Sequence, residues 1–266
     1  MESLTMPVIL LTNDDGFSSI GLLAAKKALE GLGNVVVVAP DKEYSGMGKA
    51  LTLSKRLHVN EVKLADGSKA YVVNGTPADA VLIALFKILK GKPDLLVSGI
   101  NLGPNVGMED LLDSATVGAA LEAALHGVKS VALSYALSRD PLKRGLKVSI
   151  KELKPSMEAL RRIAKAVLVN GMPKGVDLLS VNVPPGGWIG VKVTTPSRKA
   201  REDIHVEENG GSFYVRGWDL SVYPDDRINT DVGALKQGFL TITPLKALFP
   251  SSRLNLNILL KGVGQL

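Results

Sequence analysis

The first half of the chain alternates continuous apolar runs with longer segments in which apolar residues recur at helical spacing. Apolar runs without alternation are typical of strands that are covered on both faces of a parallel sheet. The runs predict strands at 7–12, 35–39, 71–74, 94–98, 130–134 and 178–183. The helical spacing predicts helices at 20–32, 77–89, 116–125 and 155–169. This β-α alternation indicates an α/β fold with a doubly wound, mostly parallel sheet.

Beyond residue 185 the pattern changes to short strand-like segments, found at 191–195, 204–208, 212–217 and 239–243, followed by the alternating LNLNILL of 254–260. Two of these segments flank Asn209-Gly210-Gly211, which is a strong β-hairpin signal. A projecting hairpin has unpaired edges, so we expect it to mediate contacts between subunits; the alternative is a solvated arm without a partner. We therefore predict a core of residues 1–185 and a hairpin-bearing oligomerisation appendage of residues 186–266.

The composition fits one large α/β domain or a domain with an appendage. The chain has 266 residues, of which 45% are hydrophobic and 22% charged, as in ordinary soluble proteins. We see no signal-peptide pattern and no apolar run that approaches a membrane span, so we expect a cytoplasmic protein without a membrane partner. The absence of cysteine excludes disulfides, thiolate zinc sites and cysteine nucleophiles.

The charged residues and common motifs exclude several further classes. A net charge of +6 suits acidic small molecules and plain solubility alike, and the dispersed basic residues do not form a stripe that predicts a dedicated nucleic-acid partner. The three histidines share no metal-ligand spacing, so a bound metal would need mostly oxygen ligands. The sequence also lacks a Walker-type phosphate loop, a G-x-G-x-x-G after its first strand, and a G-x-S-x-G nucleophile elbow.

Three loops that follow predicted strands combine oxygen-bearing side chains with glycines: NDDG at 13–16, PDKEYSGMG at 40–48 and GINLGPNVG at 99–107. In open α/β sheets, ligands bind beyond the carboxyl ends of the strands. Asp14, Asp15, Ser45 and Asn101 would together offer a set of oxygen ligands for Mg²⁺ or Mn²⁺, and the cation would offset the repulsion between the adjacent carboxylates. Each loop alone favours an ordinary turn or cap, but three in succession favour the metal site.

Two predicted helix starts carry possible anion-binding residues. In the segment 75–79, Thr76 before Pro77 is a good N-cap, and we prefer that structural interpretation to an anion site. In the segment 114–118, Ser114 and Thr116 either bind a phosphate or simply cap the helix, and the sequence leaves both possibilities open.

These loops, in this order, closely resemble the SurE family of survival proteins. The matching stretches are ILLTNDDG, VVVVAPDKEYSGMG with ALTL, NGTPADAV, PDLLVSGINLGPN, SATVGAALEAALHG, LLSVNVP and TDVGALKQGFLTITPL. They extend from residue 8 to about residue 245, and only the hairpin region is loosely patterned. The set is highly specific, although no single stretch would be.

The resemblance implies a Rossmann-like core whose C-terminal part forms homodimers or homotetramers, including exchange between subunits. It implies a phosphatase that acts on nucleoside 5′- and 3′-monophosphates with one divalent cation, Mg²⁺ or Mn²⁺, per subunit. The implied metal ligands are Asp14, Asp15, Ser45 and Asn101. The implied phosphate contacts are Gly46, Ser114, Ala115 and Thr116.

The sequence departs from the family pattern at three positions. Asp113 stands where Tyr is common, Ala115 where Gly is common, and Ala80 where Cys is frequent. None of the three is a proposed metal ligand. The departures therefore bear on substrate preference more than on the reaction.

Asp14 and Asp15 are the predicted catalytic residues. One carboxylate would hold the metal, and the other would either act as a base toward water or attack phosphorus itself. The sequence leaves this choice open. The alternative function is a non-catalytic nucleotide-sensing oligomer with a structural metal, and a phosphoryl-transfer kinase is disfavoured because the phosphate loop is missing.

Overall fold

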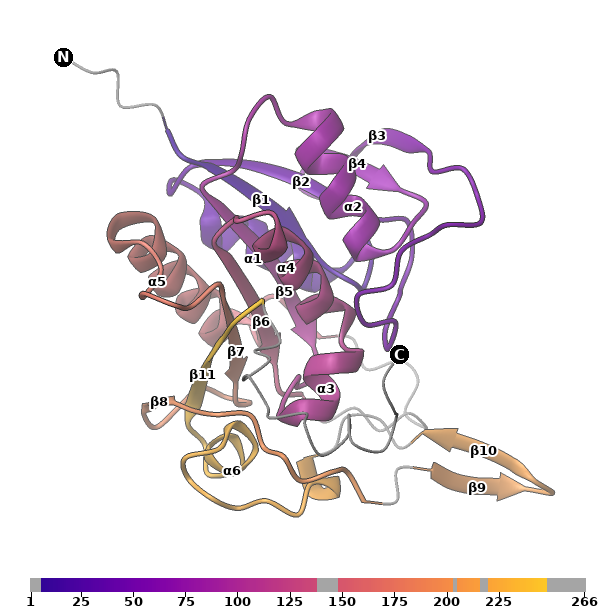
Figure 1. Ribbon diagram of the computed structural model, residues 1–266, viewed down its shortest axis with the longest axis vertical. Helices are drawn as coiled ribbons and strands as arrows, with labels where there is room; N and C mark the ends of the chain where they lie inside the picture. The colour runs from indigo at the N-terminus through magenta and orange to yellow at the C-terminus, as the bar shows by residue number, and fades with distance from the viewer. Residues whose placement is uncertain (1–5, 138–147, 203–204, 216–219, 248–266) are drawn as a thin grey trace, which may run out of the picture.

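The computed structural model describes residues 6–137, 148–202, 205–215 and 220–247. Its main body is a nine-stranded sheet in the order β3-β4-β2-β1-β5-β6-β7-β11-β8 (Figure 1). The neighbouring pairs are parallel except β3–β4 and β7–β11, which are antiparallel. The expected mostly parallel, Rossmann-like α/β sheet is therefore confirmed.

The strands of the sheet are β1 (Val8–Thr12), β2 (Asn34–Pro40), β3 (Val59–Lys63), β4 (Lys69–Val73), β5 (Leu95–Leu102), β6 (Ser130–Tyr135), β7 (Leu178–Val183), β8 (Val191–Val193) and β11 (Leu240–Leu245). A separate hairpin consists of β9 (His205–Asn209) and β10 (Ser212–Val215). The α-helices are α1 (Ile20–Leu29), α2 (Pro77–Ile83), α3 (Gly107–Asp113), α4 (Ala115–Leu125), α5 (Lys154–Asn170) and α6 (Asp231–Lys236). A π-helix, η1 (Ala84–Ile88), continues α2, and a short 3₁₀ helix, η2, spans Leu220–Val222.

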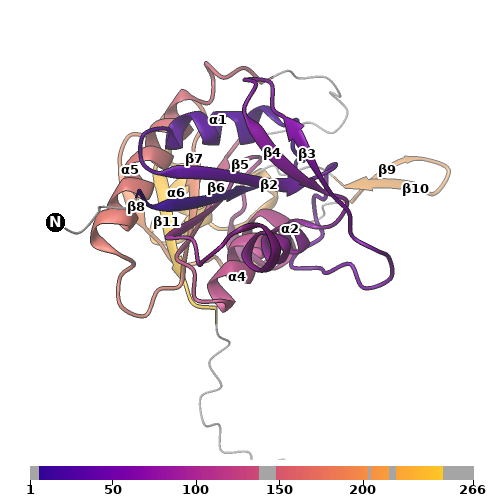
Figure 2. The same ribbon diagram turned by 90° about the horizontal axis from the view of Figure 1, so that it is seen from above.

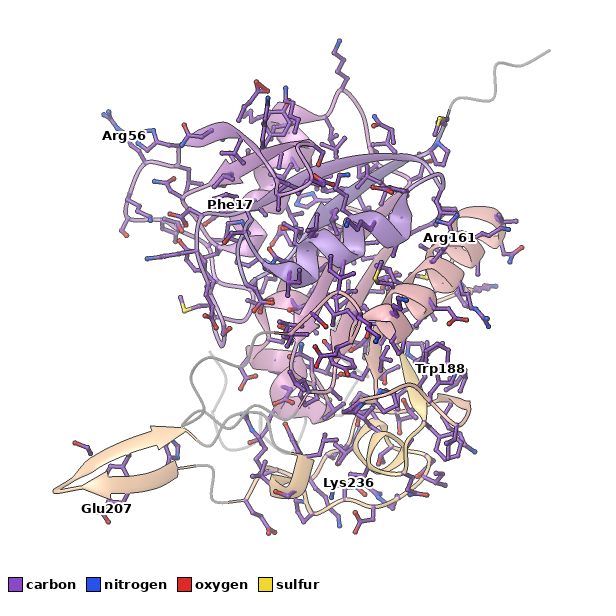
Figure 3. All side chains as sticks on the ribbon, turned by 180° about the vertical axis from the view of Figure 1, so that it is seen from behind. Phe17, Arg56, Arg161, Trp188, Glu207 and Lys236 are labelled. Carbon is purple, nitrogen blue, oxygen red and sulfur yellow. The ribbon has the colours of Figure 1, made fainter. Side chains whose placement is uncertain are left out.

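The helices cover both faces of the sheet. Successive strand side chains point to opposite faces, so Ile9 and Leu11 of β1 enter one apolar core while Leu10 enters the other. Helices α1 and α5 lie on the first face, and α2 and α4 lie on the second (Figure 2). Arg161 of α5 donates to the carbonyl oxygen of Ala28 at 2.9 Å, which ties α5 to the last turn of α1 (Figure 3). The sheet is thus packed against an apolar core on each face.

Two predicted element ends differ from the structure. The helix expected over 77–89 is α-helical only to Ile83, because the next turn widens and Leu89 donates to the carbonyl oxygen of Ala84, five residues earlier. Strand β5 continues to Leu102 rather than ending at Ser98, since its pairing with β6 resumes after a register shift. Asn101 therefore lies at the end of a strand and not in the loop that follows it.

Four elements went unpredicted, namely β3, α3, η2 and α6. Strand β3 is largely exposed and reads VNEVK, so it has no apolar run. Helices α3 and α6 have only seven and six residues, too few to show a helical period.

The second half of the chain divides its residues between the sheet and the hairpin. Strand β11 pairs with β7, and β8 pairs with β11, so both extend the sheet of the core. The predicted hairpin is confirmed as the antiparallel pair β9–β10, which turns at Gly210 and Gly211 and projects from the body (Figures 1 and 3). The boundary at residue 185 stays a prediction, and the LNLNILL segment lies outside the described residues.

Candidate metal and phosphate site

The carboxyl ends of β1 and β5 are neighbours, because Thr12 pairs in register with Ser98. The chain then turns sharply at Asn13, whose Nδ2 donates to the carbonyl oxygen of Gly16 at 3.0 Å. Gly16 has a φ of 91°, and a Cβ built there would lie 3.0 Å from the carbonyl carbon of Lys42. A side chain at this position would thus push the first loop away from the loop that follows β2.

Asp14 is the most buried acidic group of this cluster, at 4% exposure. Its Oδ1 accepts a hydrogen bond of 2.5 Å from Thr116 Oγ1 of α4, and its carbonyl oxygen accepts from Tyr44 N at 2.8 Å. Burial raises the pKa of Asp14, the hydrogen bond from Thr116 lowers it, and the nearby charge of Glu43 raises it again. Among the described residues, no lysine or arginine pairs with Asp14, so a bound cation would stabilise its charged form.

Asp15 and Asn101 lie in the same region of the sheet edge. Asp15 is half-buried beside Asp14. Asn101 is 8% exposed, and its Nδ2 donates to the carbonyl oxygen of Gly103 at 2.8 Å. This bond fixes the orientation of the amide and leaves its Oδ1 as the group that can face a cation.

Ser45 is exposed, in contrast to Asp14 and Asn101. Its Oγ donates to Oε1 of Glu43 at 2.8 Å. Ser45 follows Tyr44, whose N–H binds the carbonyl oxygen of Asp14. The backbone thus brings Ser45 to the first loop, while its hydroxyl is paired with Glu43; its role as a ligand stays a prediction.

The expected phosphate residues gather around the first turn of α4. Ser114 caps the helix by accepting a 3.1 Å hydrogen bond from Val117 N. Ala115 and Thr116 are fully buried behind it. Gly46 has a φ of 73°, and a Cβ there would meet open space. The cap expected as one of two roles for Ser114 is therefore present, and α4 is long enough, at 11 residues, to favour an anion at its start.

Close backbone packing holds the Gly46 loop against α4. Gly48 N donates to the carbonyl oxygen of Asp113 at 2.7 Å. A Cβ built at Gly118 would lie 2.6 Å from the carbonyl oxygen of Gly48. The loop after β2 and the start of α4 are therefore in direct backbone contact.

The donor set fits a hard divalent cation. Thr12 Oγ1, Asn13 Oδ1 and Ser98 Oγ are buried at the strand ends and have no hydrogen-bond partner among the described residues. Water molecules bound to a cation could donate hydrogen bonds to these three oxygens. No group of three or more histidine, aspartate or glutamate side chains that could hold a metal occurs in the described part of the chain. Two carboxylates completed by hydroxyl and amide oxygens are compatible with Mg²⁺ or Mn²⁺.

Two supports of the site could not be read from the sequence. Asn105 N donates to Asn182 Oδ1 at 2.8 Å, Asn182 Nδ2 donates back to Asn105 O at 2.9 Å, and Asn105 Nδ2 donates to Ser134 Oγ at 2.8 Å. This buried network fixes the loop after β5. The partners Asn105 and Asn182 are 77 residues apart, so no local pattern links them.

The second support is Asp231 at the start of α6. Its carboxylate accepts hydrogen bonds from Gly107 N, Ser197 N and Val232 N, each at 2.8 Å. Burial raises the pKa of Asp231, and the three backbone donors lower it. Asp231 thereby joins the appendage to the first residue of α3.

Two other helix ends are defined by their caps. Thr76 and Asp79 form a capping box at the start of α2, which confirms the structural interpretation of that segment. His126 is the C-cap of α4 and lies 3.2 Å from Oε1 of Glu122. No helix in the described ranges has the length and apolar character needed to cross a bilayer.

Fold and site residues place the chain among the doubly wound α/β proteins whose ligands bind at the carboxyl ends of the strands. The family model described as survival protein SurE matches residues 9–203. The chain is 43% identical over 242 residues to the "5′-nucleotidase SurE" of Archaeoglobus fulgidus, a match that covers 90% of each chain. It is likewise 43% identical over 206 residues to the protein of that name from Methanothermobacter thermautotrophicus, with 77% and 74% coverage.

A solved structure agrees with these sequence relatives. The structure titled as the SurE protein from Aquifex aeolicus has a TM-score of 0.76 and 30% identity, and the match covers 97% of this chain and 99% of that one. The chain therefore belongs to the SurE family, as its motifs indicated.

Proposed function

We propose that this protein is a phosphomonoesterase that hydrolyses nucleoside 5′-monophosphates, and 3′-monophosphates as well, with one Mg²⁺ or Mn²⁺ per subunit. The observation that carries the proposal is the buried carboxylate of Asp14. It accepts a hydrogen bond from Thr116 of α4 and has no basic partner within the described residues. Relatives of 43% identity that bear the name 5′-nucleotidase support the same reaction.

The chain would supply both the metal ligands and the phosphate-binding groups. Asp14, Asp15, Ser45 and Asn101 would hold the cation, which when bound polarises a phosphoryl oxygen and acidifies water. The start of α4, whose helix dipole favours an anion, would receive the phosphate. In the overall reaction the oxygen of a water ends bonded to phosphorus, the ester P–O bond breaks, and a water proton passes to the nucleoside oxygen. Of Asp14 and Asp15, the carboxylate that does not hold the metal would act as a base toward this water or attack phosphorus first.

The alternative is a non-catalytic nucleotide-sensing oligomer with a structural metal. It would use the same glycines and carboxylates. The relatives' shared name makes the enzyme the better-supported function.

The test is phosphate release from a panel of nucleoside monophosphates with Mg²⁺, with Mn²⁺ and with EDTA. Asp14→Asn is compared with Asp226→Asn, whose side chain is 86% exposed in the appendage. We expect release that EDTA and Asp14→Asn each reduce by on the order of 100-fold or more, while Asp226→Asn retains it. Release that survives both treatments would refute the site. Nucleotide binding without release would support the sensing oligomer instead.

We also propose that the protein assembles as a homodimer or homotetramer through its hairpin (200–220) and C-terminal segment. Phe213 of β10 is 64% exposed, as expected of a hairpin that meets a partner. A cytoplasmic location stays a prediction of the sequence.

A further inference from the structure

Arg201 of the appendage contacts three carboxylates of α3. Its Nε lies 3.1 Å from Glu109 Oε2, its Nη1 lies 3.2 Å from Asp110 Oδ1, and its Nη2 lies 2.7 Å from Asp113 Oδ2. Its backbone N–H also donates to Glu109 Oε2 at 2.7 Å. The side chain is only 18% exposed, so these contacts are partly shielded from solvent.

Helix α3 ends next to the residues that are expected to contact the phosphate. Its last residue, Asp113, accepts the hydrogen bond from Gly48 N and is followed at once by Ser114. Ser114 N in turn donates to the carbonyl oxygen of Asp110 at 2.8 Å. Any shift or charge change at the end of α3 therefore reaches both the Gly46 loop and the start of α4.

Without Arg201, the carboxylates of Glu109 and Asp113 would leave unpaired negative charge on the helix that precedes Ser114. Glu109, Asp110 and Asp113 form ion pairs with no other basic side chain among the described residues. Like charges that lie close to a bound phosphate dianion weaken its binding. A guanidinium that pairs with the carboxylates offsets this repulsion and fixes their orientation.

Docking of the appendage onto α3 does not depend on Arg201 alone. Met108 N donates to the carbonyl oxygen of Ser197 at 2.8 Å, and Gly107 N donates to Asp231. These backbone contacts hold the start of α3. Arg201 acts at the acidic face of α3, including Asp113. Asp113 is also a position where this chain departs from the family pattern.

We propose that Arg201 is a positioning residue that lets the phosphate site accept a dianionic phosphate, by neutralising the acidic face of α3 next to that site. This inference rests on the proposed phosphatase function. It predicts that loss of Arg201 raises KM more than it lowers kcat. It also predicts that removal of the Asp113 charge restores part of the loss.

The experiment compares wild type with Arg201→Gln, Asp113→Asn, the double variant and Arg201→Lys. The matched control is Arg227→Gln, which removes another appendage guanidinium; among the described residues, its ion pair is with Asp225 and not with α3. Each protein is assayed with adenosine 5′-monophosphate for KM and kcat. Binding of inorganic phosphate in the presence of Mg²⁺ is measured by calorimetry, which reports on the site independently of turnover.

We expect Arg201→Gln to raise KM and weaken phosphate binding by on the order of tenfold, with a smaller effect for Arg201→Lys and none for Arg227→Gln. Addition of Asp113→Asn should recover several-fold of this loss. Unchanged KM and phosphate affinity in Arg201→Gln would overturn the proposal, and so would a double variant as weak as Arg201→Gln. If Arg201→Gln does not fold, Asp113→Asn alone decides: stronger or equal phosphate binding supports the proposal, and weaker binding overturns it. An inactive wild type would refute the phosphatase function instead, while the phosphate-binding comparison still tests Arg201.

Discussion

Thr116 Oγ1 donates a hydrogen bond of 2.5 Å to Asp14 Oδ1, which connects the first loop directly to α4. Asp14 is buried, so the hydrogen bond stabilises its charged form in a place where water cannot. A bond of this kind to a charged group contributes about 1.5–3 kcal/mol. The orientation of the expected metal ligand therefore depends on a residue that is not a ligand.

Replacement of Thr116 by Val keeps the shape of the buried side chain and removes its hydroxyl. We expect Thr116→Val to lower kcat/KM by about 10–100-fold, from the energy of a hydrogen bond to a charged group, and Thr116→Ser to retain most activity. The measurement is steady-state nucleotidase kinetics at saturating Mg²⁺. Thr241→Val is the control, because Thr241 is equally buried and its Oγ1 has no partner among the described residues. Equal activity in Thr116→Val and wild type would contradict this role.

The sequence predicted residues of the site better than their supports. Asp14, Asp15 and Asn101 are candidates because each follows or ends a strand whose apolar run is visible in the sequence. Arg201 and Asp231 were not found, because their partners Asp113 and Gly107 are 88 and 124 residues away. A contact between distant segments leaves no local pattern, so the support of a site has to be read from its fold.

At the scale of elements, long apolar periods were predictive and short helices were not. Helix α3 has seven residues that begin with Gly107, and its position depends on caps and on the appendage rather than on its own period. Strand β5 runs past its expected end, because pairing with β6 resumes at Asn101 after the register shift. Local propensity therefore fixed the regular elements, while tertiary contacts decided the ends that build the site.

A substitution at Gly118 tests how α4 packs against the Gly46 loop. In an open helix, Gly→Ala stabilises by about 1 kcal/mol. At Gly118 the new methyl group would instead lie 2.6 Å from the carbonyl oxygen of Gly48, so the Gly46 loop must move. We expect Gly118→Ala to raise KM at least several-fold and to lower the thermal midpoint.

The matched control for Gly118 is Gly91→Ala, where a Cβ meets nothing within 4 Å. We expect it to leave KM unchanged. The two variants are compared by kinetics and by thermal unfolding. A Gly118→Ala protein that is more stable than wild type with the same KM would show that the loop is not held by this contact.

At the scale of the whole molecule, two surfaces are unlike an ordinary solvated surface. The hairpin β9–β10 stands away from the body (Figure 1). Its Phe213 is exposed. The sheet ends at β8, where Val191 and Val193 are 55% and 73% exposed on one face of an edge strand. Exposed apolar edges of this kind favour association with another chain.

Phe213 offers the sharper test of assembly, because it can be changed without touching the sheet. If the hairpin holds subunits together, Phe213→Asp removes an apolar side chain from the interface and places a charge there that is costly to bury. Phe213→Asp should therefore shift the protein to a smaller oligomer or a monomer. Val169→Asp is the control, since Val169 is 72% exposed on α5, which belongs to the body of the fold. Light scattering coupled to gel filtration measures the mass of each protein over a range of concentrations. We expect a dimer or tetramer for wild type and Val169→Asp, and a lower mass for Phe213→Asp. The same mass for all three proteins, or a monomeric wild type, would contradict the assembly proposed for the hairpin.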